Sequence, residues 1–214
     1  LHSVIHEQGR FGMRVIVIGG TGTIGSAVVR LLSTRHDVVT VGHKRGTYQV
    51  DLASPDSITS LFKTIGTCDA VVSTAGIAKF ASLDDLTYDD YFIGLKNKLM
   101  GQANLVRIGR PFVTNHGSFT LTSGVLSQEP MKGSCAISMA NAGLEGFVRA
   151  AAIDLPRSLR VNVVSPPWVT ETLIARGMDP SIGLPAETVA QCYLASVEGT
   201  MTGQVIDPRK HAGR

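Results

Sequence analysis

Hydrophobic residues follow two different periods along this chain, and the two periods alternate. Residues 15–18 are four consecutive β-branched residues, which is typical of a strand that is covered on both faces in a parallel sheet. Over residues 24–32 the apolar residues instead recur at helical spacing. The same patterns predict further strands over residues 38–41, 49–52, 68–76, 117–123, 160–165 and 203–207, and further helices over residues 57–65, 83–95, 96–108, 136–155 and 186–197.

Strands that alternate with helices imply right-handed crossovers between parallel strands. We therefore predict an α/β fold, namely a Rossmann-type doubly wound parallel sheet with helices on both faces. The 214 residues, of which 43% are hydrophobic, can bury the core of one such domain, so no second domain is needed. We expect this domain to span residues 13–214. Residues 1–12 lack an apolar period and are interpreted as an N-terminal extension or an expression remnant.

A glycine-rich turn separates the first predicted strand from the first predicted helix. Gly19, Gly22 and Gly25 are spaced three residues apart there. Glycines at such a turn allow a tight bend and a close approach of the backbone to a pyrophosphate, while the first helical N–H groups face the anion. This context predicts a dinucleotide site, and the alternative is a plain strand-to-helix turn. The predicted contacts are Gly19, Thr21, Gly22, Thr23, Ile24 and Gly25.

Basic residues follow the second predicted strand, at the place where dinucleotide folds distinguish two cofactors. An acidic residue there binds the ribose 2′-hydroxyl of NAD, whereas a basic residue accommodates the 2′-phosphate of NADP. The chain has His43, Lys44 and Arg45 at this place and no acidic residue before Asp51. These charges favour NADP(H) over NAD(H). The alternative is that Lys44 and Arg45 are ordinary solvated loop charges.

Small residues gather in two further places. Residues 73–76 end a predicted strand with Ser-Thr-Ala-Gly, and small side chains at the carboxyl end of a strand let a ligand lie against the backbone. The alternative for this segment is a simple turn at the edge of the sheet. The helix predicted over residues 136–155 is rich in alanine and glycine, which permits close packing of another helix and indicates a contact between subunits.

Charge and cysteine content argue against several classes of protein. The net charge of +3 comes without a dense Lys/Arg block, so nucleic acid binding is not indicated. Cys68, Cys135 and Cys192 lie far apart without CxxC spacing, which argues against a disulfide framework or a zinc site and for a reducing compartment. No apolar run is long enough to cross a membrane, and no signal-peptide pattern is visible. We expect a cytoplasmic protein without a metal centre.

Four segments together resemble the short-chain dehydrogenase/reductase family, from Met13 to the C-terminus. Residues 19–25 are similar to its cofactor turn, although the first two glycines of the family are most often four residues apart. Residues 51–52, Asp-Leu, resemble the pair that contacts adenine, and residues 73–76 resemble its Asn-Asn-Ala-Gly segment with both asparagines replaced. Residues 160–169 are similar to its Arg-Val-Asn-x-Val-Ser-Pro-Gly stretch.

The resemblance implies hydride transfer between a nicotinamide cofactor and a carbonyl or an alcohol. It also implies assembly into homo-dimers or homo-tetramers through paired long helices. The further cofactor contacts that it assigns are Asp51, Leu52, Thr74, Ala75, Gly76, Pro166 and Val169.

The family's active site is the place where this chain departs from the resemblance. The family uses a tyrosine as acid and base, and a lysine four residues later that orients the ribose and lowers the pKa of the phenol. Alignment on residues 143–147 places Ile137 at the tyrosine position and Asn141 at the lysine position. Isoleucine has no proton to give and asparagine has no charge, so neither side chain can perform the family's step.

Two catalytic candidates remain. Ser123 ends the strand predicted over residues 117–123 and matches the family serine that polarises the substrate oxygen. Lys98 stands where the family has a helical asparagine that holds a water, and its ammonium group is a candidate for the vacant site. The alternative for Lys98 is a solvated helix lysine. Cys135 is a third conceivable acid or nucleophile, but no charged neighbour in sequence activates it, so we expect a buried, inert thiol.

The segment after residue 165 holds two more departures. Pro167 replaces the glycine of the family's Pro-Gly pair, and Glu171 falls at the threonine that usually holds the nicotinamide amide. Residues 173–185 are shorter than the family's usual substrate lid, which predicts an open or small pocket.

Three functions are compatible with this sequence. The first is an NADP(H)-dependent oxidoreductase that acts on a carbonyl or alcohol and transfers its proton through Ser123, Lys98 or water. The second is a non-catalytic NADP(H)-binding protein, a sensor or an assembly partner, because the tyrosine and the lysine are both absent. The third is a scaffold that has lost the cofactor as well. The sequence names no substrate, because substrate contacts lie in loops without a transferable code.

Overall fold

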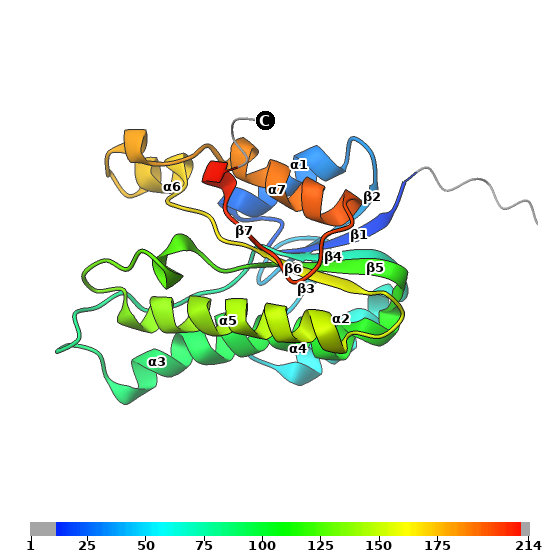
Figure 1. Cartoon of the computed structure of the whole chain (residues 1–214), viewed down its shortest axis with the longest axis horizontal. Helices are drawn as coiled ribbons and strands as arrows, with labels where there is room; N and C mark the ends of the chain where they lie inside the picture. Colours follow the sequence, from blue (N-terminus) through cyan, green and yellow to red (C-terminus); the bar gives the residue numbers. More distant parts are fainter. Residues whose placement is uncertain (1–11, 211–214) are drawn as a thin grey trace, which may run out of the picture.

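Seven strands form one parallel sheet in the computed structural model, which describes residues 12–210 (Figure 1). The strands are β1 (Arg14–Ile18), β2 (Asp37–Gly42), β3 (Tyr48–Gln49), β4 (Cys68–Ser73), β5 (Val113–Thr122), β6 (Arg160–Val164) and β7 (Val205–Ile206). Their order in the sheet is β3-β2-β1-β4-β5-β6-β7. The predicted Rossmann-type doubly wound sheet is therefore confirmed. The predicted N-terminal extension, residues 1–12, lies outside the described residues except for Gly12.

Helices cover both faces of the sheet, as predicted. On one face lie α1 (Thr23–Leu32) and α7 (Ala186–Glu198), and on the other lie α2 (Pro55–Ile65), α4 (Gly101–Gly109) and α5 (Cys135–Asp154) (Figure 1). The shorter elements are α3 (Tyr88–Gly94), the π-helix η1 (Leu95–Met100), α6 (Thr170–Ala175) and the 3-10 turns η2 (Arg110–Phe112), η3 (Val125–Ser127), η4 (Pro180–Ile182) and η5 (Pro208–Lys210).

Each face of the sheet has its own hydrophobic core, and β1 contributes to both. Ile16 and Ile18 belong to the core beneath α2, α4 and α5, whereas Val15 and Val17 belong to the core beneath α1 and α7. Successive side chains of a strand point to opposite faces, so a strand that is buried on both sides needs an apolar residue at every position. This requirement explains the uninterrupted apolar run that the sequence shows over β1.

The ends of two predicted strands are wrong. β3 ends at Gln49 rather than residue 52, because Asp51 begins a turn in which its carboxylate accepts the backbone N–H of Ala53 at 2.9 Å. β4 ends at Ser73 rather than residue 76, since Ser73 pairs with Ile18, the last residue of the neighbouring β1.

Two other predicted starts also differ. The helix predicted from residue 83 begins at Tyr88, because Thr87 and Asp90 form a capping box that fixes its first turn. β5 begins at Val113, before the predicted residue 117, since Val113 pairs with β4 across a register shift.

The strand order reverses between β1 and β4. In open α/β sheets such a reversal leaves a crevice outside the carboxyl ends of the strands, where ligands bind. The glycine turn after β1, the end of β4 and the end of β5 all lie at this edge. Within residues 12–210, no helix has the length and apolar character needed to cross a membrane.

Candidate active site

Two adjoining pockets open at the carboxyl ends of the central strands. The glycine pocket, about 290 Å³, lies against the turn after β1, and the serine pocket, about 260 Å³, lies over Ser123. Thr74 and Gly76 line both pockets, so the two form one crevice. The glycine pocket brings together eight predicted cofactor contacts: Gly19, Thr21, Gly22, His43, Leu52, Thr74, Ala75 and Gly76. The serine pocket adds Ile24, Pro166 and Val169.

The glycine turn is shaped by backbone contacts that exclude side chains. Gly19 has a φ of +81°, and an added Cβ on Gly25 would overlap the carbonyl oxygen of Gly19. The N–H of Gly22 donates to that carbonyl at 2.9 Å. No side chain caps the N-terminus of α1, so the N–H groups of Thr23 and its neighbours are left for an anion.

The basic loop lies at the far end of the glycine pocket. His43 lines the pocket, and its ring Nδ1 lies 3.3 Å from the carbonyl oxygen of Val50. Lys44 and Arg45 are exposed and line neither pocket. Asp51 is also exposed and lies outside the glycine pocket, in a neighbouring surface depression that His43 shares. Among the described residues, no carboxylate lines the glycine pocket.

Lys98 reaches from the π-helix η1 into the serine pocket. The residue is 8% exposed, and its Nζ donates a hydrogen bond to the carbonyl oxygen of Ser123 at 2.9 Å. Gly76 leaves room for this path, because a Cβ there would lie 2.8 Å from Cγ of Lys98. Burial lowers the pKa of Lys98 to about 8. The alternative of a solvated helix lysine is therefore wrong.

Ser123 is fixed by contacts on several sides. Its backbone N–H donates to the carbonyl oxygen of Val164 at 2.9 Å, and its own carbonyl accepts the ammonium of Lys98. Its hydroxyl donates to Oε1 of Glu145 at 3.0 Å. Ser123 is buried, yet it lines the serine pocket.

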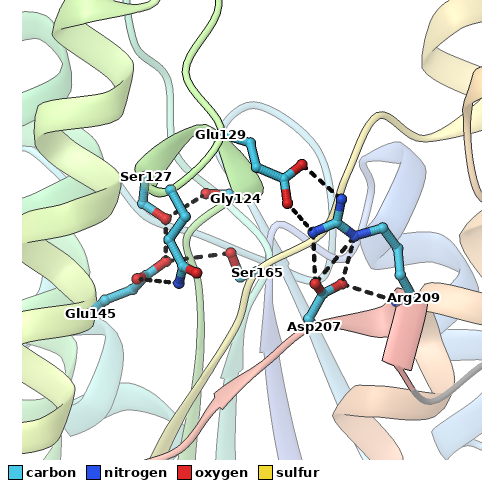
Figure 2. A network of polar contacts seen from close by, with 8 residues as sticks. Gly124, Ser127, Glu129, Glu145, Ser165, Asp207 and Arg209 are labelled. Atoms are coloured by element: carbon cyan, nitrogen blue, oxygen red, sulfur yellow. Dashed lines mark hydrogen bonds and ion pairs between the residues drawn. The ribbon is translucent and has the colours of Figure 1, made fainter.

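Glu145 is a buried carboxylate that no sequence motif marks. The residue is 3% exposed, and its Oε1 accepts the hydroxyls of Ser127 and Ser165 at 2.6 and 3.3 Å (Figure 2). The same oxygen accepts the hydroxyl of Ser123. Hydrogen bonds of this kind offset the cost of burying a charge. The available signal is its place four residues after Asn141, because residues at that spacing share one face of a helix.

An ion-pair cluster holds the loop that follows η3. Arg209 donates to Glu129 at 2.7 and 2.8 Å and to Asp207 at 2.7 Å (Figure 2). The cluster joins the segment after β7 to the loop that directly follows η3, and Val125 and Leu126 of η3 line the serine pocket. Exposed ion pairs add little singly, so its effect is to restrain this wall of the pocket rather than to stabilise the whole fold.

Asn141 has one polar atom without a partner. Its Nδ2 donates to the carbonyl oxygen of Gly124 at 3.2 Å, but its buried Oδ1 has no hydrogen-bond partner among the described residues. The residue is 1% exposed and lines the serine pocket, as does Ile137 one turn earlier. Buried polar atoms almost always have partners, so Oδ1 is a vacant acceptor for a ligand O–H or N–H.

Aromatic side chains form the outer wall of the serine pocket. The rings of Phe80 and Trp168 stack with 6.1 Å between centroids, and the guanidinium of Arg176 lies 5.5 Å from the Trp168 ring. All three residues line the pocket. A wall of this kind accommodates a flat or apolar group.

No tyrosine lines the serine pocket in the part of the chain that the structure describes. The hydroxyl of Tyr193 lies 2.6 Å from Oγ1 of Thr122, which does line the pocket. Tyr193 is fully buried, and burial raises its pKa above the usual range of a phenol. It is therefore a poor acid or base near neutral pH.

Two further expectations are resolved at the rim of the crevice. Cys135 is exposed rather than buried, because Ala136 and Ala140 occupy the buried face of α5 at its start. Glu171 turns to α7, where its carboxylate accepts the N–H of Ala186 at 3.0 Å. Its neighbour Thr172 lines the serine pocket in its place.

Known proteins match this chain over most of its length. Residues 18–205 match the family model described as enoyl-(acyl carrier protein) reductase. A short-chain dehydrogenase/reductase of Stachybotrys chlorohalonatus is 28% identical over 243 aligned positions, which cover 92% of this chain and 95% of that protein. The chain belongs to the short-chain dehydrogenase/reductase family.

Other members of the short-chain dehydrogenase/reductase family share the same architecture. The crystal structure of a protein of Listeria innocua superimposes with a TM-score of 0.88 at 35% identity, covering 92% of this chain and 99% of the other. A small-chain dehydrogenase in complex with NADPH superimposes with a TM-score of 0.80 at 26% identity, covering 92% and 96% of the two chains. The likeness extends over the whole crevice, so the fold that carries the two pockets is that of the family.

Within this short-chain dehydrogenase/reductase, the two pockets preserve the family pattern unequally. The positions that resemblance assigns to the acid-base tyrosine and its lysine hold Ile137 and Asn141, and both residues line the serine pocket. The serine is retained as Ser123, and the buried cation of the pocket comes from Lys98 on a different element. The site thus has a hydroxyl and an ammonium group, but no phenol.

Proposed function

We propose that this chain is an NADP(H)-dependent oxidoreductase that interconverts a small carbonyl compound and its alcohol, with proton transfer that does not use a tyrosine. One observation carries the proposal: the buried ammonium of Lys98 donates to the carbonyl oxygen of Ser123, and both residues line the serine pocket, beside the glycine pocket. A buried lysine costs stability, and such groups gather at functional sites.

The residues of the crevice fit a nicotinamide dinucleotide. Gly25 and Gly19 form a cradle that a Cβ would fill, next to the uncapped N-terminus of α1, which suits a pyrophosphate. At the other end, the orphaned Oδ1 of Asn141 is placed for a hydroxyl or amide donor. When bound, the cofactor supplies or takes up the hydride.

The phosphate preference follows from charge. His43, Lys44 and Arg45 follow β2, and no carboxylate lines the glycine pocket among the described residues to bind a ribose 2′-hydroxyl. The small-chain dehydrogenase that this chain resembles at 26% identity was crystallised with NADPH. Both observations support NADP(H) as the cofactor.

The chain's own residues supply the remaining chemistry. The ammonium of Lys98 places a buried positive charge at the serine pocket, where it stabilises negative charge that develops on the substrate oxygen. Ser123 lines the same pocket, and the aromatic wall of Phe80 and Trp168 holds an apolar or flat substituent.

The decisive assay measures NADPH oxidation by the purified protein with a panel of small aromatic and aliphatic carbonyls. We expect turnover with some of them, and losses of about 10²–10⁴-fold in kcat/KM for Lys98→Met and Ser123→Ala. Lys96→Met is the matched control, because Lys96 lies on the same π-helix outside the serine pocket. Binding of NADPH without oxidation of it across the whole panel would contradict the proposal.

A second candidate function is a non-catalytic NADP(H)-binding protein. The apolar Ile137 at the tyrosine position favours it. The double substitution Ile137→Tyr with Asn141→Lys distinguishes the two, since it restores the family's acid and cation in a pocket that both residues already line. A binding protein has no reductase activity before the double substitution and gains some from it. An enzyme that uses Lys98 has measurable activity beforehand and loses part of it, because two ammonium groups then repel each other in one pocket.

We also propose that the chain forms a homo-dimer or homo-tetramer through α4 and α5. Met100, the last residue of η1 before α4, and Ile153 of α5 are 51% and 86% exposed, and the small residue Ala150 of α5 is exposed as well. An exposed apolar face with small residues suits close helix packing. Light scattering on the purified protein tests this, and Ala150→Arg is expected to yield monomers.

A further inference from the structure

We propose that Glu145 is the proton partner of Ser123, and that this pair accepts the proton of an alcohol in a site that has no tyrosine. The inference rests on the proposed function. It adds that the Ser123 hydroxyl accepts a hydrogen bond from the ligand instead of donating one. Glu145 lines neither pocket, so it acts through Ser123 and is a positioning residue.

The hydrogen bonds around Glu145 fix the orientation of the serine hydroxyl. Oε1 of Glu145 accepts from Ser123 at 3.0 Å, from Ser127 at 2.6 Å and from Ser165 at 3.3 Å. An ionised carboxylate can only accept, so each hydroxyl turns its hydrogen toward it. The hydrogen of Ser123 therefore points away from the serine pocket, and the lone pairs of its Oγ are left for a ligand.

This orientation makes Ser123 an acceptor. A serine that polarises a carbonyl must donate its hydrogen to the substrate oxygen, but here the carboxylate already holds that hydrogen. A ligand hydroxyl can donate to Oγ, whereas a ketone has no hydrogen to offer. The pocket is therefore built to bind the alcohol form more tightly than the ketone form.

The proton step balances with the cofactor of the proposed function. The O–H bond of the alcohol breaks, its proton passes to Oγ of Ser123, and the serine's own proton passes to Oε1 of Glu145. At the same time the hydride of the carbinol carbon passes to the oxidised dinucleotide, so the alcohol loses two electrons and becomes a carbonyl. Reduction is the reverse of these transfers, and Lys98 stabilises the oxyanion in both directions.

Other groups in the serine pocket do not offer this route. Its only ionisable lining residues within the described chain are Lys98 and Arg176, which are both cations. Glu145 is therefore the carboxylate that reaches the pocket through a single hydroxyl. On its other side Ser127 donates to the same Oε1, and the amide Nε2 of the exposed Gln128 lies 3.5 Å from Oε2.

The test compares the affinities of 1-phenylethanol and acetophenone, two ligands of one shape that suit the aromatic wall. Binding to the protein without dinucleotide is followed by the fluorescence of Trp168, which lines the pocket and is the only tryptophan of the chain. We expect the alcohol to bind about five- to tenfold more tightly, as one hydrogen bond contributes about 1 kcal/mol.

Three variants distinguish the orientation of the Ser123 hydroxyl from a general disruption of the pocket. Glu145→Gln keeps the shape but can donate an N–H to Ser123, which frees the serine hydrogen for the pocket, so the preference is expected to vanish or reverse toward the ketone. Ser123→Ala removes the acceptor and brings the two affinities to within about twofold. Ser165→Ala is the matched control: it loses a hydroxyl from the same carboxylate oxygen but lies outside the pocket, and it keeps the preference.

A kinetic arm completes the test with NADP⁺ and the alcohol. Glu145→Gln is expected to lose at least about 10²-fold in kcat with an unchanged NADP⁺ affinity, and the double variant with Ser123→Ala to lose no more than the worse single variant. An equal affinity for alcohol and ketone in the wild type, or a preference that survives Glu145→Gln, overturns the inference. If NADP⁺ does not bind, the proposed function fails by itself, and the affinity ratio still decides the role of Glu145.

Discussion

The two halves of the crevice are built in different ways. The glycine pocket is formed by backbone, and its shape depends on residues that lack side chains, such as Gly19 and Gly25. The serine pocket depends on side chains that meet from three elements: Lys98 from η1, Ser123 after β5 and Asn141 from α5. Backbone sites tolerate almost no substitution, whereas side-chain sites can exchange their chemistry while the fold persists. A fold built in this way can keep the shape of its glycine pocket while the side chains of its serine pocket change.

The largest effect on stability is expected from a substitution that adds a side chain to the glycine turn. Gly25→Ala places a methyl group against the carbonyl oxygen of Gly19, so the turn must deform. We expect a loss of more than about 3 kcal/mol in the free energy of unfolding, or no measurable dinucleotide binding in the folded fraction.

Gly146→Ala is the matched control for this comparison. An added Cβ there meets nothing within 4 Å, and the residue lies inside α5. It is expected to raise the free energy of unfolding by about 0.5–1 kcal/mol, because alanine is the better helix former. Urea melts of both variants measure this contrast, and equal effects of the two substitutions would contradict a backbone-built turn.

A smaller effect of opposite sign is expected in the side-chain half. Burial lowers the pKa of Lys98 from 10.5 to about 8, so the folded protein resists protonation of this group. The shift corresponds to about 3 kcal/mol of lost stability below pH 8, and Lys98→Met should recover about 1–3 kcal/mol of it while activity is lost.

The difference in stability between the wild type and Lys98→Met should change with pH. Above pH 10.5 the lysine is neutral in both the folded and the unfolded states, so wild type and Lys98→Met should differ little. As pH falls from 10.5 to 8, the unfolded chain takes up the proton first and the wild type loses stability relative to the variant. Thermal melts across this range are the measurement, and a constant difference would show that Lys98 is not buried.

The activity of the wild type should respond in the opposite direction. Carbonyl reduction needs the ammonium form of Lys98, so kcat/KM is expected to fall above about pH 8, approaching tenfold per pH unit. Lys98→Arg keeps its charge at all these pH values and should flatten the fall, with a lower maximum because the fork-shaped head is larger. A profile for Lys98→Arg identical to that of the wild type would assign the fall to another group.

The smallest effect is expected at the basic loop. Lys44 and Arg45 are exposed and line neither pocket, so their attraction for a 2′-phosphate acts through water. The double substitution Lys44→Gln with Arg45→Gln should weaken NADPH binding several-fold at low salt, less at high salt, and leave NADH binding unchanged. Equal losses for both cofactors would show that the loop supports the pocket structurally.

Prediction from sequence succeeds where structure is local. The order of strands and helices follows from apolar periods, and the glycine turn lies within seven consecutive residues. The predicted ends of elements are wrong where a hydrogen bond of a single side chain sets the end of a strand or helix. Asp51 does so after β3, and Thr87 does so before α3.

The serine pocket is harder to predict from the sequence, because its contacts join residues that lie far apart in the chain. Lys98 could be placed on a helix, but its burial depends on the π-helical turn and on the missing side chain of Gly76. Glu145 carries no motif, and its role is visible only when residues from the end of β5, η3 and the end of β6 converge on it. Such a convergence is a property of the packed fold and leaves no spacing in the sequence.

The most direct test of the central claim is energy transfer from Trp168 to bound NADPH. Trp168 is the only tryptophan and lines the serine pocket, so a dinucleotide in the crevice should quench it and gain emission. We predict saturable transfer with NADPH, weaker binding of NADH, and no transfer in Gly25→Ala. Failure of both dinucleotides to bind the wild type would contradict the account and leave a dehydrogenase fold that is maintained for another purpose.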